Sequence, residues 1–494
     1  MRWAEEAGQP DGKALHGAHQ QIGAEPPGHP LSRLQARQRV ATIPHLNGRH
    51  RFPPGPGALG SLGVMTGLHH DPTAVMLGLH DDFGDLVHFR LGPQHVYVVL
   101  RADLVRQVLV THQRSFKKGP GFERARIVLG NGLLTSEGDF HLRQRRMLQP
   151  AFHRRRVASY AGIMVEEAQR LSGDMREGAV RDVAADMSQL ALRVVSRALF
   201  GAELDDDALE ISHAVAEAGE FFDYLTVALF PVLLRTPLPR IRRFKAAVRL
   251  LERETTRVIT ERRDDGEGGD DLLAILLAAR DVEGDGTGMS DEQVRDEALT
   301  LITAGHETTA NGLTWTWYEL AQHPEVETRF HEELAAVVGD RPLGPDDLAA
   351  LPYTRAVLLE SMRLYPPAWG IERRALCDQE IGGYVIPAGA AVLMPTFVVN
   401  RDARLYPDPL LFDPERFLGD VAAARPDWAY PLFGAGTRKC IGVGFAMLEA
   451  VLVLSELGRR WQLRLDESVP VIPQARVSLR PRDGLWMAPE RRSA

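Results

Sequence analysis

The sequence predicts a mainly α-helical fold of the α+β class, in which a large helical part carries a small β-rich subdomain. Segments with apolar residues at helical spacing fill the middle of the chain. The few strand-like segments lie toward its two ends. This segregation of helices from strands is typical of α+β folds. We find no internal repeat, and we expect one large domain rather than several.

Helices and strands are expected in the following order along the chain. Apolar residues at helical spacing predict helices at Asp103–His112, Phe140–Met147, Val157–Leu171, Ala185–Phe200, Leu209–Phe222 and Arg240–Arg263. Apolar and β-branched segments predict strands at Leu86–Arg90, Val96–Val99, Ala391–Met394 and Gln474–Leu479. Surface loops are expected at Asp264–Asp270 and Val282–Gly288.

The longest predicted helix begins at Ser290 and continues to His323-Pro324. Ser290 and Gln293 match a capping box. At 1.5 Å per residue the helix is roughly 48 Å long, so much of it should be buried. Its middle contains the sequence Ala304-Gly305-His306-Glu307-Thr308-Thr309. An acid and an alcohol at buried positions are costly and suggest a function. A Thr that bonds to the preceding turn and a Glu that reaches solvent are the structural alternative.

The N-terminal segment differs from the rest of the chain. Residues 1–50 are rich in Gly, Pro, His and Gln, without a sustained apolar period or the layout of a signal peptide. We expect these residues to form a disordered extension. A single domain is expected over residues 51–494, entered through the stiff Pro/Gly-rich segment Phe52–Gly57.

The composition is that of a globular enzyme. Hydrophobic residues make up 44% of the 494 residues and charged residues 25%, as in ordinary globular domains. The net charge of −8 argues against nucleic-acid binding. No run of about 18 apolar residues occurs, so no membrane span is expected. Cys377 and Cys440 are too few for a disulfide framework or a multi-cysteine metal site, and they favour a reducing, cytoplasmic location.

The strongest chemical signal surrounds Cys440. The sequence Phe433-Gly-Ala-Gly-Thr-Arg438-Lys-Cys440-Ile-Gly442 precedes an apolar helix, Phe445–Leu457. The glycines allow a tight turn, and the helix N-terminus and Arg438 favour a thiolate. A nucleophilic cysteine would need a neighbouring base, which the local sequence does not supply. A thiolate that serves as axial ligand to a haem iron fits better.

These motifs resemble those of the cytochrome P450 haem-thiolate monooxygenases, in family order, from about Phe52 to the C-terminus. The resemblance implies the cytochrome P450 fold with one haem b. It implies that Cys440 is the iron ligand, that Phe433 packs against the sulfur side of the haem, and that Ala304 faces the distal side. Thr308 and Glu307 would serve oxygen activation and proton relay. The haem propionates would be bound by His141, Arg145, Arg373 and Arg438.

The assignment of His141 and Arg145 also has support from residue spacing. His141 and Arg145 are four residues apart, on one face of a helix. Arg373 is preferred to its neighbour Arg374 as a propionate ligand only by resemblance.

The sequence Glu360-x-x-Arg363 alone does not indicate a role, because ion pairs at this spacing are common on helix surfaces. With Pro414-Glu415-Arg416-Phe417 downstream it resembles the buried structural triad of the family, which here consists of Glu360, Arg363 and Arg416. Cys377 is interpreted as an incidental thiol.

The resemblance implies a monooxygenase that inserts one oxygen atom from O2 into a hydrophobic small molecule, such as a terpenoid, a fatty acyl chain or a polyketide. Apolar segments predict a substrate pocket lined by Phe116–Leu134, Phe221–Leu238 and Ala368–Ile371. The alternatives are a haem-thiolate isomerase, dehydratase or peroxygenase, or a non-catalytic haem protein. Members with other reactions commonly alter the acid–alcohol pair, which is intact here.

Electrons are expected from a separate protein, because no flavin or iron–sulfur module is fused to the chain. The expected partner is a ferredoxin or a flavodoxin with its reductase. A basic stretch of six arginines within 14 residues could steer an acidic partner. These arginines, with two cations beside Cys440, are Arg143, Arg145, Arg146, Arg154, Arg155, Arg156, Arg438 and Lys439.

Overall fold

The structure is a computed structural model, and it describes residues 46–47, 50–201, 214, 234–264, 271–281, 283–284 and 286–492. Residues 1–45, 48 and 49 of the predicted extension lie outside this range, whereas its residues Leu46, Asn47 and His50 are paired in short strands rather than disordered. So does the predicted helix Leu209–Phe222, apart from Ala214. Four apolar residues of the predicted pocket also lie outside it, namely Phe221, Phe222, Leu229 and Phe230.

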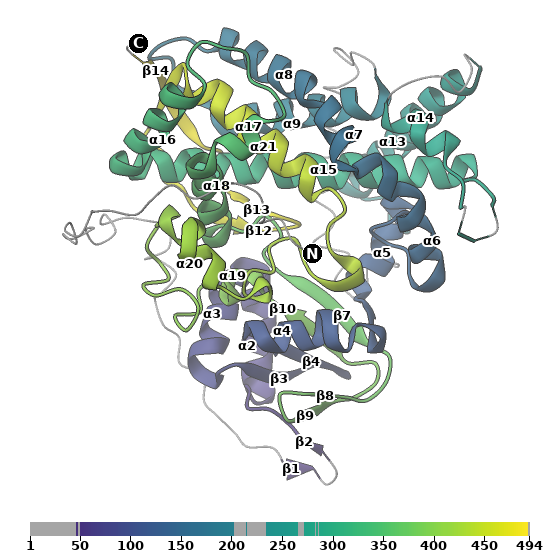
Figure 1. The fold of residues 1–494 in the computed structure, drawn as a ribbon. Coiled ribbons are helices and arrows are strands. Elements are labelled where there is room, and N and C mark those ends of the chain that lie inside the picture. The colour runs from purple at the N-terminus through teal and green to yellow at the C-terminus, as the bar shows by residue number, and fades with distance from the viewer. Residues whose placement is uncertain are drawn as a thin grey trace.

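The described part of the chain consists of a large helical part and a smaller part that contains most of the β-structure (Figure 1). The helical part contains α5 (Pro120–Leu129), α6 (Gly138–Leu148), α7 (Arg154–Ser159), α8 (Ala161–Asp174), α9 (Val183–Phe200), α13 (Pro239–Asp264), α14 (Leu272–Ala278), α15 (Asp291–Gln322), α16 (Pro324–Val337), α17 (Asp347–Ala350), α18 (Pro352–Leu364) and α21 (Val443–Gly458). This division confirms the predicted fold class.

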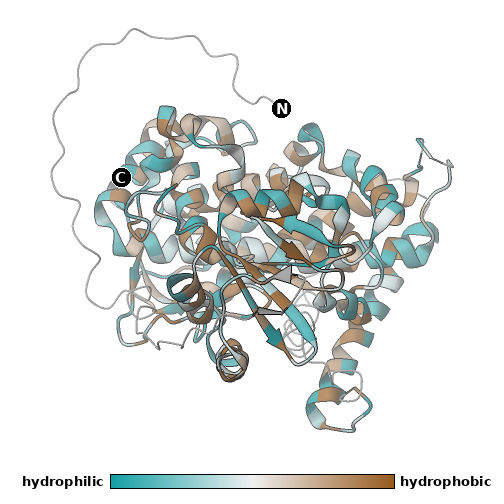
Figure 2. Ribbon diagram, turned by 90° about the horizontal axis from the view of Figure 1, so that it is seen from below, coloured by the Kyte–Doolittle hydropathy of each residue, from teal (hydrophilic) through white to brown (hydrophobic). Residues whose placement is uncertain are grey.

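Helix α15 crosses the whole helical part (Figure 1). It has 32 residues and begins with the predicted capping box, in which Gln293 N donates to Ser290 Oγ (3.2 Å) and Ser290 N donates to Gln293 Oε1 (2.9 Å). Leu313 and Trp317 are buried in the main core. Figure 2 shows hydrophilic and hydrophobic residues on the same helices, as expected where a helix packs by one face.

The smaller part is built on a five-stranded sheet with the order β3-β4-β10-β7-β5. Its strands are β3 (Leu86–Leu91), β4 (Gln94–Val99), β5 (Phe116–Lys118), β7 (Ile371–Ala375) and β10 (Ala391–Met394). Strand β10 is parallel to β4, and the other neighbours are antiparallel. Helices α2 (Ala58–His70), α3 (Pro72–Phe83), α4 (Ala102–Arg106) and α19 (Thr396–Val399) belong to this part (Figure 1). The sheet joins segments from both halves of the chain.

Short strand pairs complete the β-structure. Strands β11 (Trp461–Leu465), β14 (Trp486–Arg491) and β6 (Arg181–Asp182) form a sheet in that order. Three hairpins pair β1 (Leu46–Asn47) with β2 (His50–Arg51), β8 (Gln379–Ile381) with β9 (Tyr384–Ile386), and β12 (Pro473–Ala475) with β13 (Leu479–Pro481). Among the described residues, no helix is both long and apolar enough to cross a membrane.

The structure corrects three of the predicted elements. The predicted strand Gln474–Leu479 is the hairpin β12–β13, in which Ala475 pairs with Leu479. The predicted helix Val157–Leu171 is interrupted at Tyr160, whose ring packs near that of Phe445 on α21 (centroids 5.8 Å apart). The predicted helix Asp103–His112 is regular only to Arg106, and a π-helical turn follows. In all three segments the apolar spacing is right, but the backbone departs from the predicted element.

Candidate functional site

The Cys440 loop is a tight turn that leads into α21. Gly434 (φ 68°) and Gly436 (φ 66°) have left-handed backbone conformations, which side chains disfavour. A Cβ on Gly436 would also lie 2.2 Å from Leu109 O. Cys440 N donates to Phe433 O (2.8 Å), which closes the loop. Helix α21 begins three residues later, at Val443. The ring of Phe433 packs against the main core.

The environment of Cys440 is partly accessible and partly desolvated. Its side chain is exposed, yet burial by the surrounding protein raises the pKa of its thiol. The Gly442 backbone, Arg145 and Lys439 act in the opposite direction. Ala304 is likewise exposed, although it stands in the middle of α15 between buried residues. Cys440 therefore combines accessible surface with desolvation by the protein around it.

Three cations and His141 gather beside this loop. In the sheet, Lys118 of β5 pairs with Arg373 of β7, so their side chains are neighbours. Arg438 forms an ion pair with Glu137 and donates to Ser136 O (2.7 Å). Lys118 N donates to Glu137 Oε1 (2.8 Å), and Lys118 Nζ donates to a backbone carbonyl. Lys118, His141 and Arg373 are buried. Sequence analysis missed Lys118, because only the pairing of β5 with β7 brings it here.

Positive charge exceeds negative charge in this cluster. Burial, then Arg438, lowers the pKa of Arg373 to about 10, although Glu137 and Glu372 oppose the shift. Burial, then Arg438 and Arg373, hold the pKa of Lys118 well below its usual range. Burial, Arg438 and Lys118 lower the pKa of His141 to about 3. Glu137 pairs with Arg438, but the buried cations that repel one another still have less negative than positive charge beside them.

The cluster fits a group with carboxylates, such as the two propionates of a haem. His141 Nδ1 lies 3.2 Å from Leu133 O, and its Nε2 is buried without a hydrogen-bond partner among the described residues. An anion at this position would supply the missing charge and a partner for the imidazole. Cys440, nearby on the same loop as Arg438, has the thiol needed to bind the iron. The residues present therefore match a haem in both charge and ligand type.

Arg145 and Arg374 are placed differently from these residues. Arg145 donates to Lys439 O (2.8 Å) and partly opposes the rise that burial causes in the pKa of the Cys440 thiol, so it lies against the Cys440 loop. Arg374 lies 3.6 Å from Glu123, which gives it a partner other than Glu137. Of the two adjacent arginines, the structure brings Arg373 to the site.

The acid and the alcohol on α15 have different partners. Thr308 Oγ1 donates to Ala304 O (2.7 Å), as expected for a Thr that bonds to the preceding turn. Glu307 Oε1 accepts a hydrogen bond from Ser478 Oγ (2.6 Å), which lies in the turn between β12 and β13. Glu307 is therefore bonded to another part of the protein. This bond argues against the structural alternative, in which the Glu307 carboxylate only reaches solvent.

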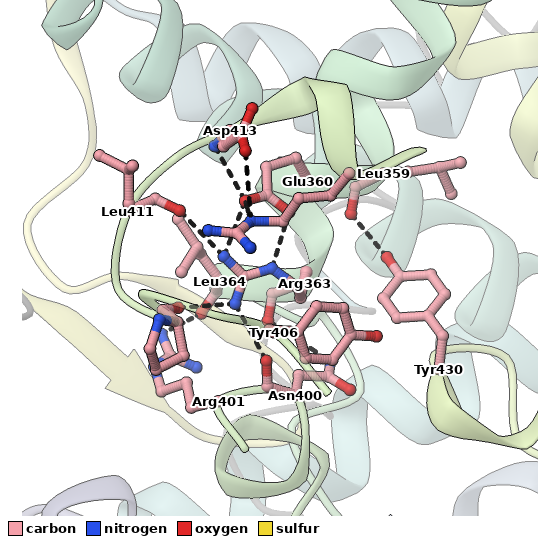
Figure 3. Close-up of polar contacts among 12 residues, drawn as sticks. Leu359, Glu360, Arg363, Leu364, Asn400, Arg401, Tyr406, Leu411, Asp413 and Tyr430 are labelled. Carbon is pink, nitrogen blue, oxygen red and sulfur yellow. Dashed lines mark hydrogen bonds and ion pairs between the residues drawn. The ribbon is translucent and has the colours of Figure 1, made fainter. Parts of the chain in front are cut away.

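Glu360, Arg363 and Arg416 lie together as a second charged cluster. Figure 3 shows Glu360 and Arg363 with the groups around them. Arg363 Nε and Nη2 each donate to Glu360 at 2.7 Å, and neither side chain is exposed. Arg416 Nε lies 3.3 Å from Glu360 Oε1 as an ion pair, without hydrogen-bond geometry. The remaining N–H groups of Arg363 donate to three backbone carbonyls, those of Asn400, Pro409 and Leu411. Every donor of Arg363 is used, so this guanidinium has none left for a ligand.

Comparison with known proteins gives consistent results. The family model described as Cytochrome P450 matches residues 53–487. Cyclooctat-9-en-7-ol 5-monooxygenase of Streptomyces melanosporofaciens is 38% identical over 83% of this chain and 89% of its own length. Pentalenene oxygenase of Streptomyces avermitilis is 36% identical over 86% of this chain and 95% of its own. The crystal structure of the cytochrome P450DA heme domain superposes with a TM-score of 0.81 at 28% identity, over 90% of this chain and 98% of that chain.

Proposed function

Since the chain belongs to the cytochrome P450 family of monooxygenases, we propose that it uses haem b to insert one oxygen atom from O2 into a cyclic terpenoid. The excess of buried positive charge beside an accessible thiol carries the haem assignment. The two relatives whose names specify cyclooctat-9-en-7-ol and pentalenene carry the substrate class. Cyclooctat-9-en-7-ol and pentalenene are compact hydrophobic molecules, which agrees with the apolar segments that are predicted to line the pocket.

In this proposal the cationic cluster holds the cofactor. Arg373, Arg438 and His141 would bind the propionates, with Lys118 as a further donor, and Arg145 would support the Cys440 loop. Cys440 would bind the haem iron through its thiolate, and Phe433 and Ala304 would contact the haem. When bound, a haem with a thiolate ligand supplies oxygen activation, because thiolate donation favours O–O cleavage.

The α15 residues would deliver protons. Thr308 has a hydroxyl that can exchange its bond to Ala304 O for one to a guest in the pocket. Glu307, held from the side by Ser478, would carry the proton to that hydroxyl. The intact pair favours oxygen insertion over isomerase, dehydratase or peroxygenase chemistry, and over a non-catalytic haem protein.

The cysteine assignment can be tested by spectroscopy. We expect the reduced carbon monoxide complex to show the red-shifted Soret band of thiolate ligation. Cys440→Ser should abolish this band, whereas Cys377→Ser, which changes the other free cysteine, should retain it. Loss of the band in Cys377→Ser would refute the assignment. Pentalenene and cyclooctat-9-en-7-ol serve as probes of the substrate class, with oxygenated product detected by mass spectrometry. Oxidation of a fatty acid but of neither probe would refute the terpenoid class.

We also propose a separate ferredoxin or flavodoxin, with its reductase, as the electron donor. The basic segment supports this proposal, because Arg146, His153, Arg155 and Arg156, with Glu283, line an open surface cavity of about 760 Å³. Such a concentration of positive charge attracts an acidic partner. The two free cysteines of this chain support a cytoplasmic location for the enzyme and its electron donor.

A further inference from the structure

The turn between β12 and β13 meets α15 at the proposed proton-relay residue. We propose that Ser478, itself held by Asn311, is a positioning residue that fixes the direction of the Glu307 carboxylate. This inference rests on the proposed function, because it concerns how Glu307 is held while it relays protons. It adds a residue far along the chain, 171 positions from Glu307, to the machinery on α15.

The three side chains form a hydrogen-bonded chain with one direction. Asn311 Nδ2 donates to Ser478 Oγ (2.8 Å), and Ser478 Oγ donates to Glu307 Oε1 (2.6 Å). Asn311 stands one helical turn after Glu307, so both bonds come from one face of α15. Because Nδ2 can only donate and the hydroxyl has a single proton, that proton must point to Glu307. Ser478 and Asn311 are buried, at 2% and 7% exposure, and Glu307 is half-buried, so the Ser478 hydroxyl is shielded from bulk water.

The hairpin that carries Ser478 is itself anchored on both sides. Trp315 Nε1 of α15 donates to Leu479 O (2.9 Å). Trp369 Nε1 donates to Arg476 O (2.7 Å), and Leu479 N donates to Pro367 O (3.0 Å). The residues on either side of Ser478 are therefore tied to two different elements. The hydroxyl cannot leave Glu307 by movement of the turn alone without breaking these bonds.

Kinetics of the haem-loaded enzyme test this role. A plant ferredoxin with its reductase supplies electrons, and oxygen uptake and hydrogen peroxide release are measured with pentalenene and without any organic guest. General acid–base groups contribute about 10²–10⁴-fold to rates, so we expect Glu307→Gln to reduce coupled turnover strongly and Ser478→Ala to reduce it by about tenfold. Ser478→Ala should raise the peroxide fraction and leave the optical dissociation constant of the guest within about twofold. Ser478→Thr, which keeps a hydroxyl, should restore the rate.

Ser455→Ala is the matched control, since Ser455 is a fully buried serine on α21 whose hydroxyl has no partner among the described residues. If Ser478→Ala behaved like Ser455→Ala while Glu307→Gln was impaired, the positioning role would be overturned. If Glu307→Gln itself retained normal rates and peroxide release, the proton-relay function proposed for Glu307 would fail first. The two failures are thus distinguishable.

A second readout does not depend on turnover. Unfolding of the haem-loaded protein in denaturant is compared for Ser478→Ala, Glu307→Ala and the double variant. Bonded partners give non-additive losses, so the double variant should lose less stability than the two single variants together. Strictly additive losses would show that the bond between Ser478 and Glu307 does not form in solution, and would overturn the inference.

Discussion

The two buried charged clusters of this protein differ in how their charges are balanced. In the Glu360 cluster, two carboxylates, those of Glu360 and Asp413, face the two guanidinium groups of Arg363 and Arg416. The other donors of Arg363 bond to backbone carbonyls. In the Arg438 cluster, Glu137 faces Arg438 and Lys118, with Arg373 and His141 close by. The charges of the first cluster are balanced, whereas the second cluster has more positive than negative charge. Burial of charge does not by itself indicate a ligand site, and the imbalance of charge does.

The comparison leads to opposite expectations for removal of an arginine. A buried charge is tolerated when its partners cancel it, and loss of one partner leaves the other uncompensated. In the Glu360 cluster each substitution should therefore damage the fold. In the Arg438 cluster, loss of one cation relieves repulsion among the others and should damage ligand binding instead.

The largest effect is expected for Arg363→Leu. This change leaves the Glu360 carboxylate buried without its main partner, at a cost of about 3–5 kcal/mol of unfolding free energy. Chemical denaturation should show the loss with and without haem. The control is Arg482→Leu, which removes an exposed ion pair with Asp483 (2.9 Å) and should cost less than about 1 kcal/mol. Similar losses for the two variants would break the comparison.

A pH-dependent effect is expected next, from His141. Its pKa of about 3 in the folded protein lies below the value of 6.5 that applies on unfolding. As the pH falls from 6.5 toward 3, the unfolded chain takes up a proton that the folded protein does not. The haem-free protein should therefore lose up to roughly 4 kcal/mol more stability over this range than His141→Asn does. Denaturation at pH 7 and pH 4.5 measures the difference, and equal losses would contradict the assigned environment.

Arg373→Leu should give the converse of Arg363→Leu. We expect the haem-free protein to keep its stability within about 1 kcal/mol, and haem to dissociate about tenfold faster or more, since a charge-assisted bond contributes about 1.5–3 kcal/mol. Transfer of haem to a scavenging apoprotein measures the rate. Arg374→Leu is the matched control, because Arg374 is adjacent and has Glu123 as its partner. Faster loss of haem from Arg374→Leu than from Arg373→Leu would reverse the assignment.

The smallest effect is expected at the surface. Lys439 is exposed beside Cys440, and Lys439→Glu should slow reduction by an acidic ferredoxin by about threefold to tenfold. The difference should shrink as salt rises, since the screening length is about 10 Å at 0.1 M. Arg143→Glu is a less direct probe, because Arg143 donates to Thr287 Oγ1 (2.7 Å) and lies 3.5 Å from Asp281. A reduction rate that is indifferent to both salt and Lys439→Glu would exclude docking at this face.

Sequence analysis found the parts of the molecule that local sequence encodes. The Cys440 loop needs glycines at two left-handed positions, and α15 needs Ser290 and Gln293 at its first turn. Such requirements leave a pattern within a few residues. The hairpin β12–β13 was missed, because Gln474–Leu479 has the composition of a strand and the turn at Ser478 is stabilised by bonds from Trp315 and Trp369. Each of these donors lies more than 100 positions along the chain from its acceptor in the hairpin.

The sequence by itself determined the family, the thiol that can bind iron, and the helix with the acid–alcohol pair, because each depends on neighbouring residues. Only the tertiary structure decided which charges meet. Adjacent residues of a strand point to opposite faces, so the pair Arg373-Arg374 offers one arginine to each side, and the register of β7 with β5 decides that Arg373 lies beside Lys118. Ser478 likewise reaches Glu307 across 171 positions of the chain, through a hydrogen bond between their side chains. Electrostatic and hydrogen-bond partners are set by distance in space, and that distance is fixed only when the whole chain has packed.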